Sequence, residues 1–207
     1  MTVIKLCGLS RPCDIETANL LKPDYIGFVF AKKSRRFVPP DHARELKQML
    51  NPGISAVGVF VNESPEIVAS LLNGGVIDVA QLHGGEDEDY ISRLRTLTRA
   101  PLIKAFRIDA AQDVAAALRS SADHILLDSG SGGTGNAFDW TLLREIERPY
   151  FLAGGLRPEN AAQAVRLLHP WGVDVSSGIE TNQQKDPDKM RAFVRIVREQ
   201  ARKDELP

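Results

Sequence analysis

The stretch YFLAGGLRPENAAQAVRLLHPWGVDVSSG, residues 150–178, contains the repeating unit that decides the fold. Its two apolar runs, Tyr150–Ala153 and Val173–Ser176, are typical of buried β-strands, and a short glycine-containing turn follows each of them. The residues between the runs have room for one helix. This order of elements indicates a strand–helix–strand unit with parallel strands.

Comparable runs rich in Val, Ile, Leu and Phe recur about every 20–30 residues, the spacing of strand–helix units. They are continuous rather than alternating, which is typical of parallel strands covered by helices. Eight such runs predict a single (β/α)8 TIM barrel, with residues 1–207 as one domain, because no linker or charge run divides the chain. An open doubly wound sheet has the same local pattern and remains an alternative. The predicted strands are Val3–Leu6, Tyr25–Phe30, Ala56–Val61, Ile77–Leu82, Leu102–Phe106, His124–Asp128, Tyr150–Ala153 and Val173–Ser176.

Two helix starts are marked by a capping side chain followed by proline, at Ser64-Pro65 and Asp186-Pro187. Beyond the second start, apolar residues recur on one face and predict a final helix. Those residues are Met190, Phe193, Val194, Val197 and Ala201.

The composition, 43% hydrophobic and 26% charged, is that of an ordinary globular protein. The 26 Lys and Arg residues nearly balance the 27 Asp and Glu residues, so we expect no nucleic-acid partner. No apolar stretch approaches the roughly 20 residues of a membrane helix and no signal-peptide pattern opens the chain, so we expect no membrane partner. Two cysteines, Cys7 and Cys13, are too few for a disulfide framework and favour a cytoplasmic protein. We expect a monomer, because every long apolar stretch is assigned to a strand or a helix.

Glycine-containing turns follow the last two predicted strands. LAGGL (152–156) contains Gly154 and Gly155, and DVSSGIE (174–180) contains Ser177 and Gly178. Glycine lets backbone N–H groups approach an anion closely, and the ends of strands seven and eight are the usual phosphate site of this fold. A tight turn would explain one glycine pair alone. Two loops at the two expected strands favour a small phosphorylated partner.

A third glycine-rich stretch, DSGSGGTGNAFDW (128–140), follows the sixth predicted strand. It lacks the lysine and the spacing of a nucleotide-binding P-loop. A mobile loop that covers the substrate fits the pattern better, and we count its Gly132 and Gly133 among the substrate-binding residues.

Cys7 and Asp128 stand at the ends of the first and sixth predicted strands. A buried cysteine is most often inert packing, and an aspartate after a strand is most often a turn former. These two strands, however, lie across the barrel mouth from one another, so their end residues can flank one substrate. A thiolate base and a carboxylic acid would then form a proton-transfer pair. Cys13 falls within the first helical segment, and we interpret it as structural.

Two further polar residues follow predicted strands. Arg36, in KKSRRFV, is suited to bidentate binding of a substrate carboxylate, whereas its neighbour Arg35 is interpreted as a surface residue. His83, in QLHG, either orients the site and its ligand or packs within the rim. The histidines and cysteines show no metal-ligand spacing, so no metal is expected.

Together these residues resemble the phosphoribosylanthranilate isomerases of the tryptophan pathway. The resemblance covers essentially the whole chain, because a set of motifs occurs in the same order. The motifs are IKLCGL (4–9), YIGFVF (25–30), SRRFV (34–38), VGVFVN (57–62), QLHG (81–84), IKAF (103–106), LLDS with GGTG and FDW (126–140), LAGGL (152–156), and DVSSGIE with KD (174–186).

The resemblance implies an Amadori rearrangement of N-(5-phosphoribosyl)anthranilate to 1-(2-carboxyphenylamino)-1-deoxyribulose 5-phosphate without cofactor or metal. It implies that Cys7 is the general base, that Asp128 is the general acid and that Arg36 binds the anthranilate carboxylate. The acid must be protonated and the thiol deprotonated at neutral pH, so both need tuning by their surroundings. The substrate-binding residues are expected to be Arg36, His83, Gly132, Gly133, Gly154, Gly155, Asp174, Ser177 and Gly178.

One departure concerns the loop after the eighth predicted strand. Members of the family often carry glycine just before the KD that opens the last helix, whereas this chain has TNQQKD at 181–186. We expect a different path for this loop, with the phosphate site retained.

Three rival interpretations remain. The histidine-pathway aminoaldose isomerase, a similar phosphate-binding barrel, would be expected to carry aspartate in place of Cys7. An enzyme that acts on the aminoaldoses of both pathways is a second alternative. A non-catalytic phosphosugar-binding barrel is the third, and such a protein should have lost Cys7 or Asp128 while keeping its glycine loops.

Overall fold

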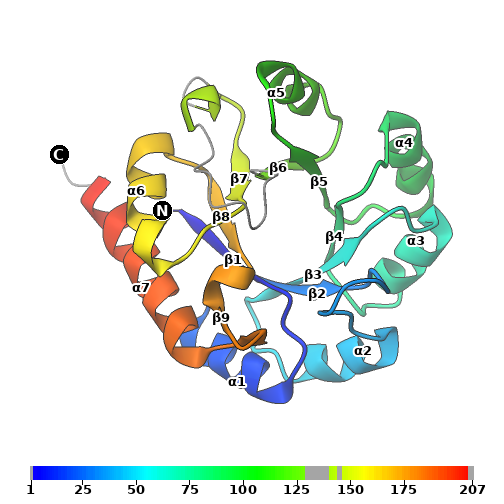
Figure 1. Cartoon of the computed structure of the whole chain (residues 1–207). Helices are drawn as coiled ribbons and strands as arrows, with labels where there is room; N and C mark the ends of the chain where they lie inside the picture. The colour runs from blue at the N-terminus through cyan, green and yellow to red at the C-terminus, as the bar shows by residue number, and fades with distance from the viewer. Residues whose placement is uncertain (1, 129–139, 144–145, 205–207) are drawn as a thin grey trace.

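The computed structural model describes residues 2–128, 140–143 and 146–204. Its eight parallel strands close into a barrel in sequential order, with β1 paired to both β2 and β8 (Figure 1). The closed ring confirms the predicted barrel and excludes the open sheet. The strands are β1 Val3–Cys7, β2 Tyr25–Val29, β3 Ser55–Phe60, β4 Val79–Leu82, β5 Leu102–Arg107, β6 His124–Asp128, β7 Tyr150–Ala153 and β8 Gly172–Val175.

Helices surround this barrel on the outside (Figure 1). Between β6 and β7 the described residues form only the short 3-10 helix η1, Trp140–Leu143. Within the described part of the chain, no helix has the length and apolar character to cross a membrane. The α-helices are α1 Pro12–Leu21, α2 Pro40–Gln48, α3 Pro65–Asn73, α4 Glu88–Leu97, α5 Ala111–Leu118, α6 Pro158–Leu168 and α7 Pro187–Asp204.

The two predicted helix starts are confirmed. The Ser64 hydroxyl accepts the backbone N–H of Ile67 at 3.4 Å at the start of α3. The Asp186 carboxylate accepts the backbone N–H groups of Asp188 and Lys189 at 2.9 and 3.3 Å at the start of α7. Side-chain oxygens thus satisfy donors that the first turn of each helix leaves without an intrahelical partner.

Alternation along the strands divides the apolar residues into two cores. In β6, Ile125 and Leu127 belong to the large core shared with the helices, whereas Leu126 belongs to a smaller cluster with residues such as Val57 and Phe151. This smaller cluster fills the barrel interior. Because the interior is filled with side chains, the strand ends provide the space for a ligand.

Aromatic rings occupy the N-terminal end of the interior. His124, the first residue of β6, stacks on Trp171 with ring centroids 4.5 Å apart, and Tyr25, the first residue of β2, meets Phe151 edge to face at 5.8 Å. The same inward face carries polar residues further along two strands, at Gln81 in β4 and at Asp128, the last residue of β6.

Candidate active site

Apart from Asp174, which lies inside β8 (Gly172–Val175), the described residues that the sequence assigns to a site lie at the C-terminal ends of strands or in the loops that follow them. Cys7 ends β1 and Asp128 ends β6, and in the ring these strands are separated by β7 and β8. His83 follows β4, and Arg36 lies in the loop after β2. In a closed parallel barrel these ends surround one mouth. The predicted Gly132 and Gly133 lie outside the described residues.

Glycines on both sides of Cys7 shape its surroundings. Cys7 is 7% exposed and pairs in register with Gly27 of β2, where a Cβ would lie only 2.7 Å from the Cys7 Sγ. Gly8 has φ 79°, and a Cβ there would lie 2.5 Å from Cδ of Arg36. Glycine at these two positions therefore leaves room for the thiol and for the arginine. Cys13 is exposed on α1, so the expected structural role of Cys13 is not one of core packing.

A buried ion pair lies beside Cys7. Lys5 Nζ donates to Asp174 Oδ1 at 2.8 Å, and the two residues face each other in the register of β1 and β8. Burial works to lower the pKa of Lys5, but the charges of Asp174 and Cys7 outweigh it and raise the pKa. Asp174 is a predicted substrate-binding residue; the structure gives its carboxylate Lys5 as a partner.

Burial is the largest influence on the thiol and raises the pKa of Cys7. The positive charges of Lys5 and Lys185 oppose that rise, whereas Asp174 adds to it. The positive charges of two lysines therefore act on the base predicted from the sequence, but its setting favours the neutral thiol overall.

A chain of polar contacts leads to Asp128. Asp128 Oδ2 lies 3.5 Å from His83 Nε2, and His83 Nδ1 lies 2.8 Å from Nε2 of the buried Gln81. When the Gln81 amide donates to Nδ1, the proton of a neutral imidazole resides on Nε2 and faces Asp128. The His83 ring therefore contacts the predicted acid, and its role in orienting the site or its ligand stays a prediction.

A second buried ion pair supports the loop after β4. Lys104 Nζ lies 3.2 Å from Glu86 Oε2 and donates to the carbonyl of Gly84 at 2.7 Å. The same carboxylate accepts the backbone N–H groups of Asn62 and Gly84 at 2.6 and 2.8 Å. The loop that carries His83 is therefore tied to β3 and β5.

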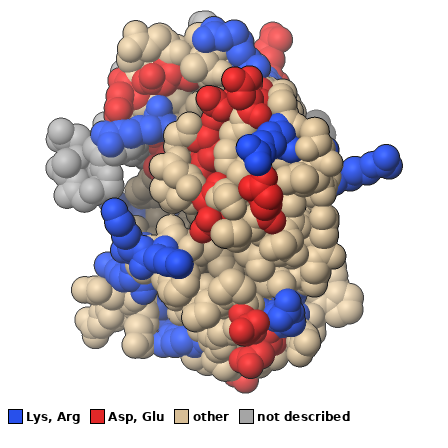
Figure 2. Space-filling view, turned by 90° about the vertical axis from the view of Figure 1, so that its right-hand side faces the viewer, with Lys and Arg blue, Asp and Glu red and all other residues tan. Residues whose placement is uncertain are grey.

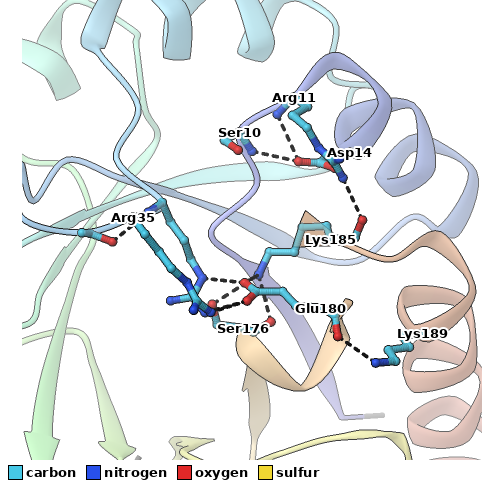
Figure 3. Close-up of polar contacts among 10 residues, drawn as sticks. Ser10, Arg11, Asp14, Arg35, Ser176, Glu180, Lys185 and Lys189 are labelled. Atoms are coloured by element: carbon cyan, nitrogen blue, oxygen red, sulfur yellow. Dashed lines mark hydrogen bonds and ion pairs between the residues drawn. The ribbon is translucent and has the colours of Figure 1, made fainter. Parts of the chain in front are cut away.

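Three cations converge on Glu180, whose side chain is only 5% exposed (Figure 3). Arg36 donates through Nε and Nη2 at 2.5 and 2.9 Å, Arg35 through Nη2 at 2.6 Å, and Lys185 through Nζ at 2.7 Å. Burial works against the ionised carboxylate, but hydrogen bonds from Arg36 and Lys185 outweigh it and lower the pKa of Glu180 to about 2. A cavity of about 360 Å³ is lined by all four side chains. Arg35 is exposed, with 46% of its side chain accessible, as its interpretation from sequence as a surface residue expects, and it also contacts Glu180.

The TNQQKD segment forms a two-stranded hairpin. Its strands are β9, Glu180–Thr181, and β10, Gln184–Lys185, and the two turn residues Asn182 and Gln183 have φ 51° and 65°. Arg11, the residue that precedes α1, holds β10 through the Lys185 carbonyl at 2.7 Å (Figure 3). The hairpin thus brings Glu180 and Lys185 to the same point. The expectation that this loop follows a different path from the one in other family members stays a prediction.

The two predicted phosphate loops touch each other. Gly154 and Gly155 have φ 85° and 62°, a conformation that glycine adopts without strain. Gly178 belongs to the 3-10 helix η2, Ser177–Ile179, and a Cβ on it would lie 1.9 Å from the Leu156 carbonyl oxygen. Only glycine lets the β8 loop pack this closely on the β7 loop. Gly155 and Ser177, one on each of these loops, are exposed.

Positive charge gathers on the same side of the molecule. In Figure 2, Lys and Arg side chains lie around a hollow along the left-hand edge, the front of Figure 1, whereas Asp and Glu side chains spread over the neighbouring flank. Such a rim attracts anionic ligands. Within the described ranges, no three His, Cys, Asp or Glu side chains are grouped so that they could hold a metal ion.

Sequence reasoning missed Lys5, Gln81, Glu180 and Lys185 as members of this site. A signal existed for two of them: Lys5 and Gln81 are polar residues inside apolar strands, at the positions that alternation points inward. Glu180 and Lys185 lie within the family motifs, but their partners are remote in sequence.

Comparison with known proteins gives a consistent result. The family profile described as N-(5'phosphoribosyl)anthranilate (PRA) isomerase matches residues 4–196. The N-(5'-phosphoribosyl)anthranilate isomerase of Endomicrobium trichonymphae is 44% identical, over 96% of this chain and 99% of the relative. That of Caldanaerobacter subterraneus subsp. tengcongensis is 43% identical, over 96% and 98%.

Solved structures agree. The phosphoribosyl anthranilate isomerase of Thermotoga maritima is 35% identical, with a TM-score of 0.88 over 96% of this chain and 100% of that chain. A second isomerase structure, in complex with reduced 1-(o-carboxyphenylamino)-1-deoxyribulose 5-phosphate, is 34% identical with a TM-score of 0.86 over the same shares. The chain belongs to the N-(5'-phosphoribosyl)anthranilate isomerase family.

Proposed function

We propose that this protein converts N-(5'-phosphoribosyl)anthranilate into 1-(2-carboxyphenylamino)-1-deoxyribulose 5-phosphate, a step of tryptophan biosynthesis. Membership of the isomerase family is the first support. The observation that carries the proposal is the arrangement of Cys7 and Asp128 at the ends of two separated strands of one mouth. A substrate between them would meet a base on one side and an acid on the other.

The two ends of the substrate have matching partners. Its phosphate would bind at Gly154, Gly155, Ser177 and Gly178, where two glycine loops touch. Its carboxylate would bind to Arg36. Glu180 engages the Nε and Nη2 donors of that guanidinium, so the substrate would meet the end that carries Nη1. Fixing both ends orients the carbon between them for proton transfer.

The first chemical step opens the sugar ring. The Asp128 carboxyl gives its proton to the furanose oxygen, and the bond between C1′ and that oxygen breaks. The lone pair of the anilino nitrogen forms a C=N bond to C1′, which leaves a protonated Schiff base and a carboxylate on Asp128. His83, 3.5 Å from that carboxylate, would hold it in place.

The second step moves the carbon-bound proton. The Cys7 thiolate takes the proton from C2′, the C–H electron pair forms a C1′=C2′ bond, and the C=N pair returns to nitrogen. The resulting enolamine tautomerises to the C2′ ketone, so substrate and product are isomers. These steps need no redox cofactor and no metal, because acid and base suffice.

The rival functions are less well supported. A histidine-pathway aminoaldose isomerase would be expected to have aspartate where this chain has Cys7. Acceptance of that second aminoaldose would be an additional activity of the same site. A barrel that only binds a phosphosugar would not need the paired Cys7 and Asp128.

The proposal also covers the oligomeric state and the cellular location of the protein. We propose a monomer. Among the related solved structures, one is of monomers generated from the dimeric Thermotoga maritima enzyme, so light scattering on the purified chain is the direct test. Two free cysteines suit a reducing compartment, and we propose the cytoplasm.

The decisive experiment measures isomerase activity in Cys7→Ser and Asp128→Asn. The fluorescent anthranilate adduct is generated in situ, and its loss is followed in time. We expect each substitution to lower kcat by orders of magnitude with little change in affinity for inorganic phosphate. Cys13→Ser, at the exposed cysteine, is the matched control and should retain full kcat. Near-normal turnover in either variant would remove that residue from the mechanism, and an inactive wild-type chain would overturn the function.

A further inference from the structure

Lys5 is a charged side chain in an otherwise apolar strand. It is 0% exposed, and β1 has the sequence VIKLC around it. Lysine is almost never fully buried without a partner, because removing an ammonium group from water is costly. Its burial inside a barrel therefore needs a specific reason.

The position of Lys5 supplies one. Lys5 and Cys7 are two residues apart on β1, so both side chains face the barrel interior. The Lys5 ammonium donates to Asp174 Oδ1 at 2.8 Å, and its positive charge acts on the Cys7 thiol from the same face of β1. Asp174 is opposite Lys5 on β8 and fixes the end of its long side chain.

The other cation near the thiol is already occupied. Lys185 Nζ donates to Glu180 Oε1 at 2.7 Å and to the carbonyl and hydroxyl oxygens of Ser176 at 2.9 and 3.3 Å. These partners use the three donors of an ammonium group. Lys5 has one carboxylate contact at hydrogen-bond distance and retains donors for the sulfur.

We propose that Lys5 is a positioning residue that acts through Cys7: held by Asp174, its buried ammonium stabilises the thiolate that takes the proton from the substrate. The negative charge of Asp174 partly offsets the effect of the Lys5 charge on the sulfur. This inference rests on the proposed function only in naming the proton that Cys7 removes. The ionisation itself, loss of the thiol proton to solvent, is a property of the free protein.

The charges around the thiol predict opposite effects for the two partners. Lys5 lowers the pKa of Cys7 and Asp174 raises it, against the dominant effect of burial. Lys185 also lowers it, and Gly27 on the neighbouring strand contributes no charge. Removing Lys5 should therefore make the thiolate rarer at a given pH, and removing the Asp174 charge should make it more common.

The test measures the rate of Cys7 alkylation by iodoacetamide as a function of pH. All variants carry Cys13→Ser, so that only one thiol reacts. We expect Lys5→Met to move the alkylation midpoint up by about one pH unit and to slow alkylation about ten-fold at pH 8. Asp174→Asn should move the midpoint down. A residue that only supports the fold would not move it in opposite directions.

The matched control is Lys104→Met. Lys104 is also a buried lysine of a strand, paired with the carboxylate of Glu86 at 3.2 Å, but it is not among the charges that act on Cys7. Its removal leaves a buried carboxylate unpaired, as in Lys5→Met, and should leave the midpoint unchanged. An equal shift in both variants, or no shift in Lys5→Met, overturns the inference.

A second comparison covers the case in which Lys5→Met does not fold. In the Asp174→Asn background, adding Lys5→Met removes the cation without stranding a carboxylate, and the midpoint should rise by about one pH unit. No rise there overturns the inference.

Activity measurements separate this inference from the proposed function. In an active protein, Lys5→Met should lower kcat at pH 7 about ten-fold, with partial recovery as the pH rises and with little change in KM. If the wild-type chain has no isomerase activity but the alkylation shifts occur, the function fails and the ion-pair inference stands. If activity is normal and the alkylation shifts are absent, the proposed function stands and the ion-pair inference fails.

Discussion

The two sides of the barrel mouth are built by different means. On the β7–β8 side, the loops around Gly154 and Gly178 are shaped by backbone conformation and by close packing of glycine. On the β1–β2 side, Arg36, Glu180 and Lys185 form a cluster of buried and half-buried charges. The first arrangement suits an anion that is bound by backbone N–H groups. The second suits a carboxylate that is bound by charged side chains. We therefore expect the β7–β8 side to be destabilised most by substitutions that add bulk. We expect the β1–β2 side to be destabilised most by substitutions that remove a charge.

The largest expected effect is that of Gly178→Ala on the glycine side. Its Cβ would meet the Leu156 carbonyl oxygen at 1.9 Å, so one of the two backbones must move. We expect the free energy of unfolding to fall by about 3 kcal/mol or more. Urea denaturation followed by circular dichroism measures it.

Gly155→Ala is the matched control for that prediction. Gly155 has φ 62°, but a Cβ there meets nothing within 4 Å. The cost should therefore be the conformational strain alone, about 1–2 kcal/mol. Similar losses in the two variants would show that backbone strain, and not the contact between the loops, limits this side.

The second prediction concerns Glu180→Gln on the charged side. The pKa of Glu180 is lower in the folded protein, about 2 against an ordinary 4.5, so its ionised form stabilises the fold. That contribution is complete above about pH 4.5 and is lost as the pH falls towards 2. At about 1.4 kcal/mol for each pH unit, it amounts to roughly 3 kcal/mol at neutral pH. Denaturation at pH 7, 4 and 3 should show a loss in the wild type that Glu180→Gln lacks.

Asp41→Asn controls for a general effect of removing one acidic residue. Asp41 is 95% exposed and contacts Arg44 at 3.2 Å. Exposed pairs of this kind contribute little, so the variant should keep the acid sensitivity of the wild type. Acid sensitivity that persists unchanged in Glu180→Gln would assign it to other carboxylates.

The two sides also differ in how far the sequence predicts them. The glycine side and the strands depend on local patterns, and each predicted strand ends within two residues of the observed one. The largest deviation is at β4, where the buried Ile77 precedes the hydrogen-bonded strand that begins at Val79. Local patterns therefore suffice for the strands and for the glycine turns, whereas the pairing of β1 with β8 shows that the sheet closes.

The charged side depends on contacts between distant residues. Arg36 and Glu180 are 144 positions apart, so the sequence indicates a cation suited to a carboxylate but does not indicate that a protein carboxylate already binds it. Lys5 meets Asp174 only because β1 closes the ring against β8. Sequence patterns alone do not predict these pairings, because they arise from closure of the barrel.

The smallest change in stability is expected for Gln183→Gly, a substitution in the hairpin turn of the charged side. Asn182 and Gln183 both have positive φ in the turn between β9 and β10, where two-residue hairpins prefer Asn-Gly. Asn tolerates this conformation, but Gln with its Cβ is strained there. We expect the variant to gain about 0.5–1 kcal/mol of stability, measured by urea denaturation. Asn182→Gly should gain less, because Asn already tolerates positive φ. If Gln183→Gly instead destabilises the protein, contacts of the Gln183 side chain hold the hairpin, and the charged side then depends on side chains even at its turn.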